Sequence, residues 1–278
     1  MSRRRKARRE EGAPPDGRPG LIRRVGPRRA VGLLAAATLV SVALAAGLFV
    51  VARGGDSTDG AKTAAIIDQL SLTQPNPDFV ASARSLLADA QYLVDYFPGE
   101  QVTVDFYRGL PQRHYDLIIF RVHAGITTER DISSGELEET EYVSLFTGEP
   151  YNQDKYSDEQ VNRLGRAVYY EGADPLFGIG PRFIEESMQG TFDDAIIVMM
   201  GCDGLRSQRT AQAFLDKGAS DFVSWSKPVS APHTDAATER LLELLVSEGL
   251  EPAAAVSQTA SELGPDPTYD AELRILSQ

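Results

Sequence analysis

The sequence contains one cysteine and three histidines among its 278 residues. A single cysteine excludes an internal disulfide, and one cysteine with scattered histidines gives no zinc-ligand spacing. Phosphate-binding loops and dinucleotide fingerprints are also missing, because the fragment Phe177-Gly178-Ile179-Gly180 lacks a third glycine and a preceding strand. The sequence therefore predicts neither a metal site nor a cofactor.

Basic residues are too few for a nucleic-acid-binding protein. The chain has 28 Lys and Arg against 40 Asp and Glu, which gives a net charge of −12. Residues 1–30 hold eleven basic and three acidic residues, so the rest of the chain carries −20. Phosphate binding needs clustered Lys and Arg, and we therefore expect no nucleic acid as a partner.

Charge is absent from residues 31–52, which are mostly Val, Leu, Ala, Gly and Phe. As a helix this run spans about 33 Å, enough for a hydrocarbon core of ~30 Å. The Arg-rich tail before it predicts a cytoplasmic N-terminus and a main domain beyond the cell membrane. A cleaved signal peptide is the alternative, since Ala43-Leu44-Ala45 resembles a cleavage site. The apolar run continues past Ala45, which favours an uncleaved anchor.

These patterns divide the chain into four parts. They are a basic cytoplasmic tail over 1–30, a transmembrane helix over 31–52, a linker over 53–61 and an extracytoplasmic domain over 62–278. The last part is long enough for a sizeable core. Its strand-like and helix-like runs alternate, which predicts an α/β fold with a mainly parallel central sheet and helices on both faces.

The individual elements follow from hydrophobic periodicity and from capping residues. Asn76 or Asp78 is expected to cap the first helix, and Thr234 the longest one. Residues 129–141 are charged and predict a mobile loop, and the longer segment 126–141 could be a lid or a cleavage site. Strands are expected over 64–70, 92–97, 102–107, 116–122, 195–200, 221–225 and 273–276, with 142–146 and 167–170 as a small excursion off the main sheet. Helices are expected over 79–90, 210–217, 234–248 and 252–263, with a turn and a short helix over 178–188.

Two of the expected strands end in residues that can do chemistry. The run 117–122 leads into His123, and the run 195–200 leads into Gly201 and Cys202. Sites in open α/β sheets gather at the carboxyl ends of parallel strands, so the two side chains can meet if their strands are neighbours. A thiol becomes a nucleophile when it is ionised, and an imidazole can accept its proton. The alternative is that Cys202 belongs to the core, as free cysteines often do.

Residues beside this pair are candidates for supporting roles. Gly201, and Gly125 beside the histidine, would let backbone N–H groups approach an oxyanion. Asp203 follows the cysteine, and His233 precedes the expected cap Thr234, where it can face the same edge of the sheet. We consider both as candidates for substrate contact.

Arg121 lies two residues before His123, and strand alternation places the two side chains on one face. Two roles are open for it. The guanidinium binds an acidic group of a substrate, or it pairs with an internal acid such as Asp116 or Glu149.

The order strand-His-small-Gly, strand-Gly-Cys, then helix, strand and helix resembles the caspase-like cysteine peptidases, especially the gingipain-type and CHAT-type branches. The segments 200–204, 210–219 and 222–229 are similar to the region after the catalytic cysteine of CHAT domains, and the resemblance covers roughly 62–278. It implies a three-layer sandwich, Cys202 as nucleophile, and His123 as its general base or acid. The family usually has glycine directly after the histidine, where its N–H helps to form the oxyanion hole. Here Ala124 intervenes, so either Ala124 supplies that N–H or the hole is incomplete.

The leading hypothesis is a membrane-anchored cysteine peptidase that acts on a peptide or protein through Cys202 and His123. The alternative is a catalytically inactive caspase-like module that binds a peptide or an envelope partner. A third hypothesis, a thiol redox sensor, lacks a second cysteine to resolve a sulfenate within the chain.

Overall fold

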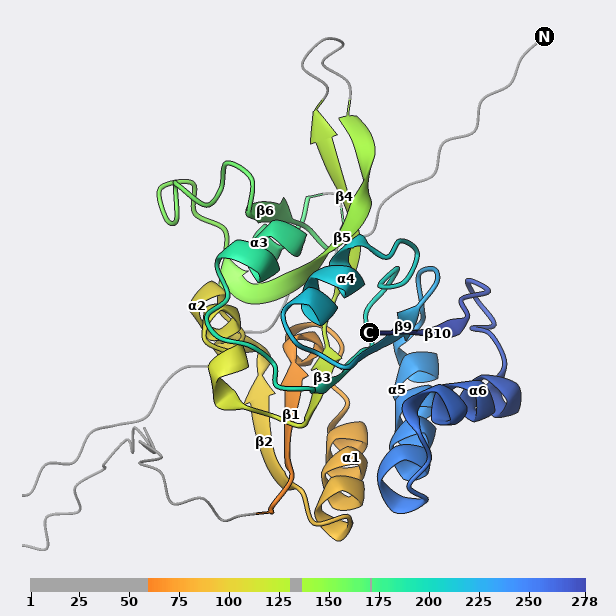
Figure 1. Ribbon diagram of the computed structural model, residues 1–278. Helices are drawn as coiled ribbons and strands as arrows, with labels where there is room; N and C mark the ends of the chain where they lie inside the picture. Colours follow the sequence, from red (N-terminus) through yellow and green to blue (C-terminus); the bar gives the residue numbers. More distant parts are fainter. Residues whose placement is uncertain (1–59, 131–136, 171) are drawn as a thin grey trace, which may run out of the picture. The chain divides into compact units, whose positions relative to one another are not determined.

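The computed structural model describes residues 60–130, 137–170 and 172–278, with the backbone alone for 128–130 and 137–141 (Figure 1). The expected tail, transmembrane helix and most of the linker lie outside this range and stay predictions. Among the described residues, no helix is long and apolar enough to span a bilayer. The chain divides into two units, 1–55 and 56–278, and the account below concerns the second.

A six-stranded sheet forms the centre of this unit, in the spatial order β10-β9-β8-β3-β1-β2. All neighbouring strands are parallel except β10, which is antiparallel to β9. The mainly parallel central sheet expected from the sequence is thereby confirmed. The strands are β1 (Thr63–Asp68), β2 (Leu93–Pro98), β3 (Leu117–Arg121), β8 (Ile196–Met199), β9 (Asp221–Trp225) and β10 (Leu273–Ser277).

Helices cover both faces of the central sheet because its inner strands are apolar on both sides. In β3, Ile118 and Phe120 join one buried cluster, while Leu117 and Ile119 join another. The first cluster packs against α2 (Val104–Arg108), α3 (Pro181–Glu186) and α4 (Arg209–Asp216). The second packs against α1 (Pro77–Asp89), α5 (Ala231–Leu242) and α6 (Pro252–Leu263).

A second sheet, antiparallel and in the order β4-β5-β7-β6, leaves the main one directly after His123 (Figure 1). The expected excursion off the main sheet is confirmed. The expected loop over 129–141 is wrong where β4 and β5 extend into it. Backbone pairing between residues 128–130 and 137–139 forms the hairpin there, and charged side chains do not prevent such pairing. The strands are β4 (Ala124–Arg130), β5 (Leu137–Pro150), β6 (Leu164–Ala167) and β7 (Leu176–Ile179).

Three local expectations need correction. The strand expected over 102–107 is the helix α2, because the side chain of Thr103 accepts the N–H of Phe106 at 3.1 Å and starts a helical turn. The strand expected over 167–170 lies earlier, over 164–167. The cap expected at Thr234 is wrong: α5 begins at Ala231, and Thr234 is buried within it. The capping role of Asn76 is confirmed by its bond to the N–H of Phe79 at 3.1 Å.

Candidate functional site

The two strand ends that lead to His123 and Cys202 lie side by side in the central sheet. β3 and β8 are parallel neighbours with Phe120 opposite Met199. The N–H of Met200 continues the pairing by donating to the carbonyl of Phe120 at 2.9 Å. His123 and Cys202 both line one cavity of about 230 Å³. The structure therefore brings the two residues together at the carboxyl ends of adjacent parallel strands.

Gly201 allows the close approach of these two chain segments. A Cβ atom at this position would lie 2.6 Å from the carbonyl oxygen of Val122 and 2.9 Å from the Cβ of Ala124. It would also lie 3.4 Å from the backbone nitrogen of Ala124. Gly201 and Ala124, two of the three residues expected to form an oxyanion site, are thus backbone neighbours. Gly125 follows in β4, where it pairs with Ser144.

Hydrogen bonds from the end of β1 hold His123 in place. The backbone N–H of His123 donates to the side-chain oxygen of Gln69 at 2.9 Å, and its Nε2 lies 2.9 Å from the hydroxyl of Thr73. Gln69 also donates to the hydroxyl of Tyr169 at 2.7 Å. The Tyr169 ring packs against the imidazole with 4.6 Å between centroids. The ring is therefore fixed through Nε2, and among the described residues Nδ1 has no hydrogen-bond partner.

The His123 imidazole is neutral at pH 7. Burial, and after it the positive charge of Arg121, lowers the pKa of the ring from 6.5 to about 4. A neutral ring has one unprotonated nitrogen. If Nε2 donates its proton to Thr73, that nitrogen is Nδ1, which can then accept a proton.

The Cys202 thiol is half-buried and also neutral. Its Sγ lies 3.8 Å from the carbonyl oxygen of Val229, to which it donates. Burial raises the pKa of the thiol, and the negative charges of Asp203 and Asp266 act in the same direction. No hydrogen bond joins Cys202 to His123 within the described part of the chain. The resting site therefore holds a neutral thiol and a neutral imidazole, without an ion pair.

Arg121 is buried with 1% of its surface exposed and pairs with internal carboxylates. Its Nη1 lies 2.9 Å from Asp68, and its Nε lies 2.8 Å from Asp235. The expected internal partners, Asp116 and Glu149, are wrong. Asp116 binds the N–H of Thr63, and Glu149 binds the N–H of Val104 and the Lys155 ammonium. The prediction failed because strand alternation shows on which face of the sheet Arg121 lies but does not identify the carboxylates that pack against that face.

Asp203 and His233, the other two candidates for substrate contact, are absent from the described lining of this cavity. Asp203 is buried, its N–H donates to the carbonyl of Lys227 at 3.1 Å, and its φ is 61°. The ring of His233 packs against Trp225 with 5.2 Å between centroids. Any contact of either residue with a substrate stays a prediction.

The sequence reasoning missed several residues of the site. Gln69 and Thr73 follow β1, which is the other neighbour of β3, so the same strand-end argument could have identified them. Pro228, Val229 and Tyr269 line the cavity. Pro228 and Val229 belong to the segment 222–229 quoted for the resemblance, which assigned them no role, and Tyr269 comes from a segment that no motif marks.

The described residues contain no group of three or more His, Cys, Asp or Glu side chains that could hold a metal ion. Fold and site together define a mixed α/β protein with a thiol and an imidazole in one cavity. No protein-family model matches the chain, and a search of curated proteins gives no match.

Proposed function

We propose that the protein is a membrane-anchored, caspase-like cysteine peptidase in which Cys202 is the nucleophile and His123 exchanges the proton. The observation that carries this proposal is the shared cavity of the two side chains at the ends of adjacent parallel strands. Helices on both faces of the sheet are compatible with the three-layer sandwich that the resemblance implies. The anchor is the apolar run 31–52, which would place the domain outside the cytoplasm.

The chemistry proceeds from a neutral pair. A substrate carbonyl displaces the thiol from Val229, Sγ forms a bond to the carbonyl carbon, and Nδ1 of His123 takes the thiol proton. The C–N bond then breaks, and the leaving amine takes that proton. Water attacks the thioester, giving its proton to Nδ1. Release of the acid returns the proton to Sγ, so atoms and charges balance over the cycle.

Backbone groups beside Cys202 are the proposed oxyanion donors. Gly201 and Ala124 lie next to each other, and neither has a bulky side chain that would keep an oxygen away. On this proposal Ala124 provides the N–H that glycine provides in the family, with Gly125 as the next one along β4.

The cavity favours a small apolar side chain next to the scissile bond. Its lining includes Leu70, Val122, Met200 and Val229, and no Asp, Glu, Lys or Arg of the described residues contributes to it. Its volume of about 230 Å³ suits one side chain better than a whole drug-sized ligand, which needs ~300 Å³ or more. We therefore propose peptides with an apolar residue at this position as the substrate class.

The test uses the full chain in a neutral detergent and a fluorogenic peptide library that varies the residue before the scissile bond. We expect cleavage after small apolar residues, no cleavage by Cys202→Ala, and a loss of about 10²-fold or more in His123→Ala, as for removal of a general base. His114→Ala is the matched control, because His114 is exposed and pairs with Asp193. Unchanged cleavage by Cys202→Ala would contradict the proposal.

A second candidate function, a non-catalytic peptide-binding module, is favoured by the resting contacts. The thiol donates to Val229, and the imidazole is bonded to Thr73. This alternative predicts no cleavage of any peptide and equal alkylation of Cys202 by iodoacetamide in wild type and His123→Ala. It further predicts that binding of apolar peptides survives Cys202→Ala.

A further inference from the structure

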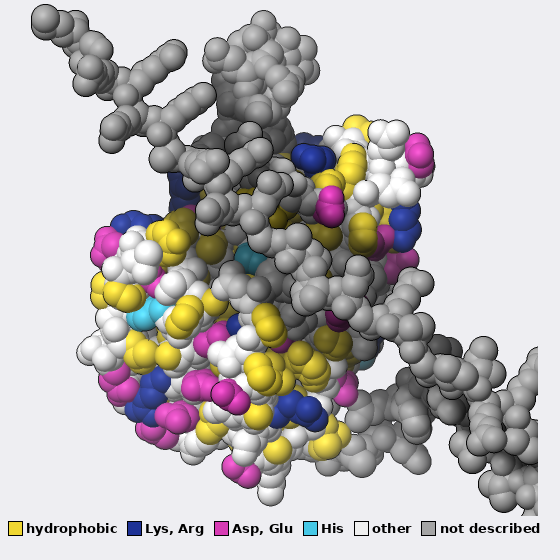
Figure 2. All heavy atoms as spheres, turned by 180° about the vertical axis from the view of Figure 1, so that it is seen from behind, with side chains coloured by type: hydrophobic (Ala, Val, Ile, Leu, Met, Phe, Trp, Pro, Cys, Tyr) yellow, Lys and Arg dark blue, Asp and Glu magenta, His cyan; other side chains and the backbone are white. Residues whose placement is uncertain are grey.

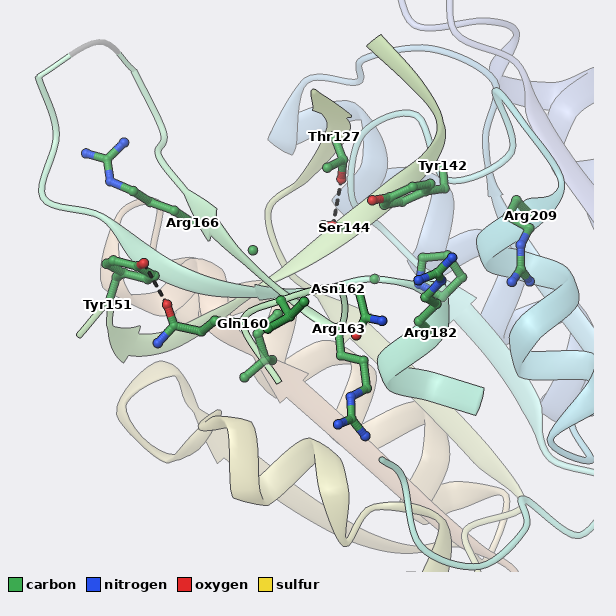
Figure 3. Close-up of a pocket in the computed structure, with 15 residues that line it drawn as sticks. Thr127, Tyr142, Ser144, Tyr151, Gln160, Asn162, Arg163, Arg166, Arg182 and Arg209 are labelled. Atoms are coloured by element: carbon green, nitrogen blue, oxygen red, sulfur yellow. Dashed lines mark hydrogen bonds between the residues drawn. The ribbon is translucent and has the colours of Figure 1, made fainter. Parts of the chain in front are cut away.

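A second and larger cavity, of about 730 Å³, lies beside the antiparallel sheet (Figure 3). None of the residues that line it lines the cavity of Cys202. Its walls come from β4, β5 and β6, the segment before β6, and the first residues of α3 and α4. Two hydrogen bonds brace these walls: Thr127 to Ser144 at 2.8 Å and Tyr151 to Gln160 at 2.6 Å.

The charge of this lining is opposite to that of the chain. Four arginines line the cavity, and none of its described lining residues is acidic. The whole chain, by contrast, carries a net charge of −12, and acidic side chains are spread widely over the face seen in Figure 2. The arginines are Arg163, Arg166, Arg182 and Arg209.

Two of the four arginines have internal partners. Arg209 forms a two-pronged pair with Glu185. Arg163 lies 3.5 Å from the hydroxyl of Ser187 and 3.9 Å from the carboxylate of Glu186. The Nε of Arg163 is nevertheless buried, and it has no hydrogen-bond partner within the described part of the chain. A buried donor of this kind needs a water or a ligand to satisfy it.

The other two arginines have no carboxylate partner among the described residues. Neither Arg166 nor Arg182 forms a hydrogen bond or an ion pair there, and both are exposed. Figure 3 shows Arg182 near Arg209 on one side of the cavity, whereas Arg166 extends on the opposite side. Both guanidinium groups would attract an anion that enters the cavity.

We infer that this cavity binds a small ligand with more than one phosphate or carboxylate group. Guanidinium groups match the geometry of both anions through paired N–H donors. Arg182 engages an anionic group directly, and Arg166 on the opposite side adds positive potential to the cavity. The volume lies within the range of ~300–1,000 Å³ typical of small-molecule sites. The tyrosines and glycines of the walls supply a neutral surface for the remainder of the ligand.

The test is isothermal titration calorimetry of the full chain in a neutral detergent, with pyrophosphate and, separately, citrate. We expect at least one of the two to bind, and its identity shows whether phosphate or carboxylate is preferred. Arg182→Gln is expected to weaken binding by about 10- to 100-fold, the loss of one charge-assisted hydrogen-bonded pair. Arg182→Lys keeps the charge but not the paired donors, so its affinity should lie between those of wild type and Arg182→Gln.

Arg84→Gln is the matched control, because Arg84 is an exposed residue of α1 outside the cavity and the substitution removes the same charge. It should bind as wild type does, and so should Cys202→Ala, which separates this site from the proposed peptidase. Equal weakening by Arg84→Gln and Arg182→Gln would overturn the inference, as would the absence of binding by both anions at millimolar concentration. Binding of a polyglutamate peptide alone would overturn it in favour of an acidic protein segment.

Discussion

The parallel and the antiparallel sheet each border a cavity, and the two cavities differ in charge and in origin. The cavity at the parallel sheet is small and mainly apolar, and its two reactive side chains follow neighbouring strands. The cavity at the antiparallel sheet is larger, and its arginines come from separate segments of the chain. A parallel sheet collects its strand ends at one edge, so sequence position predicts site position there. An antiparallel sheet has no such common edge.

The largest expected difference between the two regions concerns the energetic role of their arginines. Arg121→Met would leave Asp68 and Asp235 buried without a counter-charge and lower the free energy of unfolding by about 3–5 kcal/mol. Arg182→Gln should change it by less than ~0.5 kcal/mol, because Arg182 is exposed. Urea unfolding followed by the fluorescence of Trp225, the single and buried tryptophan, measures both.

A triple variant separates lost charge pairing from lost packing at Arg121. Combining Arg121→Met with Asp68→Asn and Asp235→Asn removes the stranded carboxylates and should recover part of the stability. Equal losses in Arg121→Met and Arg182→Gln would remove the contrast between a structural arginine and a ligand-binding one.

The next largest effect concerns the glycines where the two sheets meet. Gly201→Ala would place a Cβ atom against Val122 and Ala124, and such overpacking costs about 1–3 kcal/mol. Gly125→Ala in β4 is the matched control, because its Cβ would have no atom within 4 Å and the expected change is below ~0.5 kcal/mol. The same urea experiment measures both variants. A similar loss of stability in both variants would contradict the prediction that the crowding is specific to Gly201.

A further expected effect is the pH dependence that His123 gives to the parallel-sheet region. Its pKa is lowered from 6.5 to about 4 on folding, so between these values the unfolded chain binds more protons. Stability from this residue is therefore fully present above pH 6.5 and is lost as the pH falls toward 4. The arginines of the other cavity stay charged over this range.

Unfolding midpoints in urea measured from pH 7 down to pH 4 check this prediction. The decline should be shallower in His123→Ala than in wild type, because the variant lacks the titrating ring. Identical slopes would show that burial and Arg121 do not disfavour the imidazolium as described.

Hydrophobic periodicity was sufficient to place most elements of the central sheet and its helices. It failed for α2 because Val102, Val104 and Phe106 alternate as a strand would, while the cap at Thr103 decides for a helix. It failed for the β4–β5 hairpin because backbone pairing there does not require an apolar face. Both errors arise where local hydrogen bonds act against the hydrophobic pattern.

The sequence by itself determined the α/β class and the positions of His123 and Cys202 at strand ends, because short apolar runs closed by glycine leave few alternatives to buried parallel strands. Only the tertiary structure decided which strands are neighbours, that Arg121 pairs with Asp68 and Asp235, and that four distant arginines share one cavity. The reason is physical: periodicity is a local property of the chain, whereas charge pairing and cavity lining depend on contacts between residues far apart in sequence.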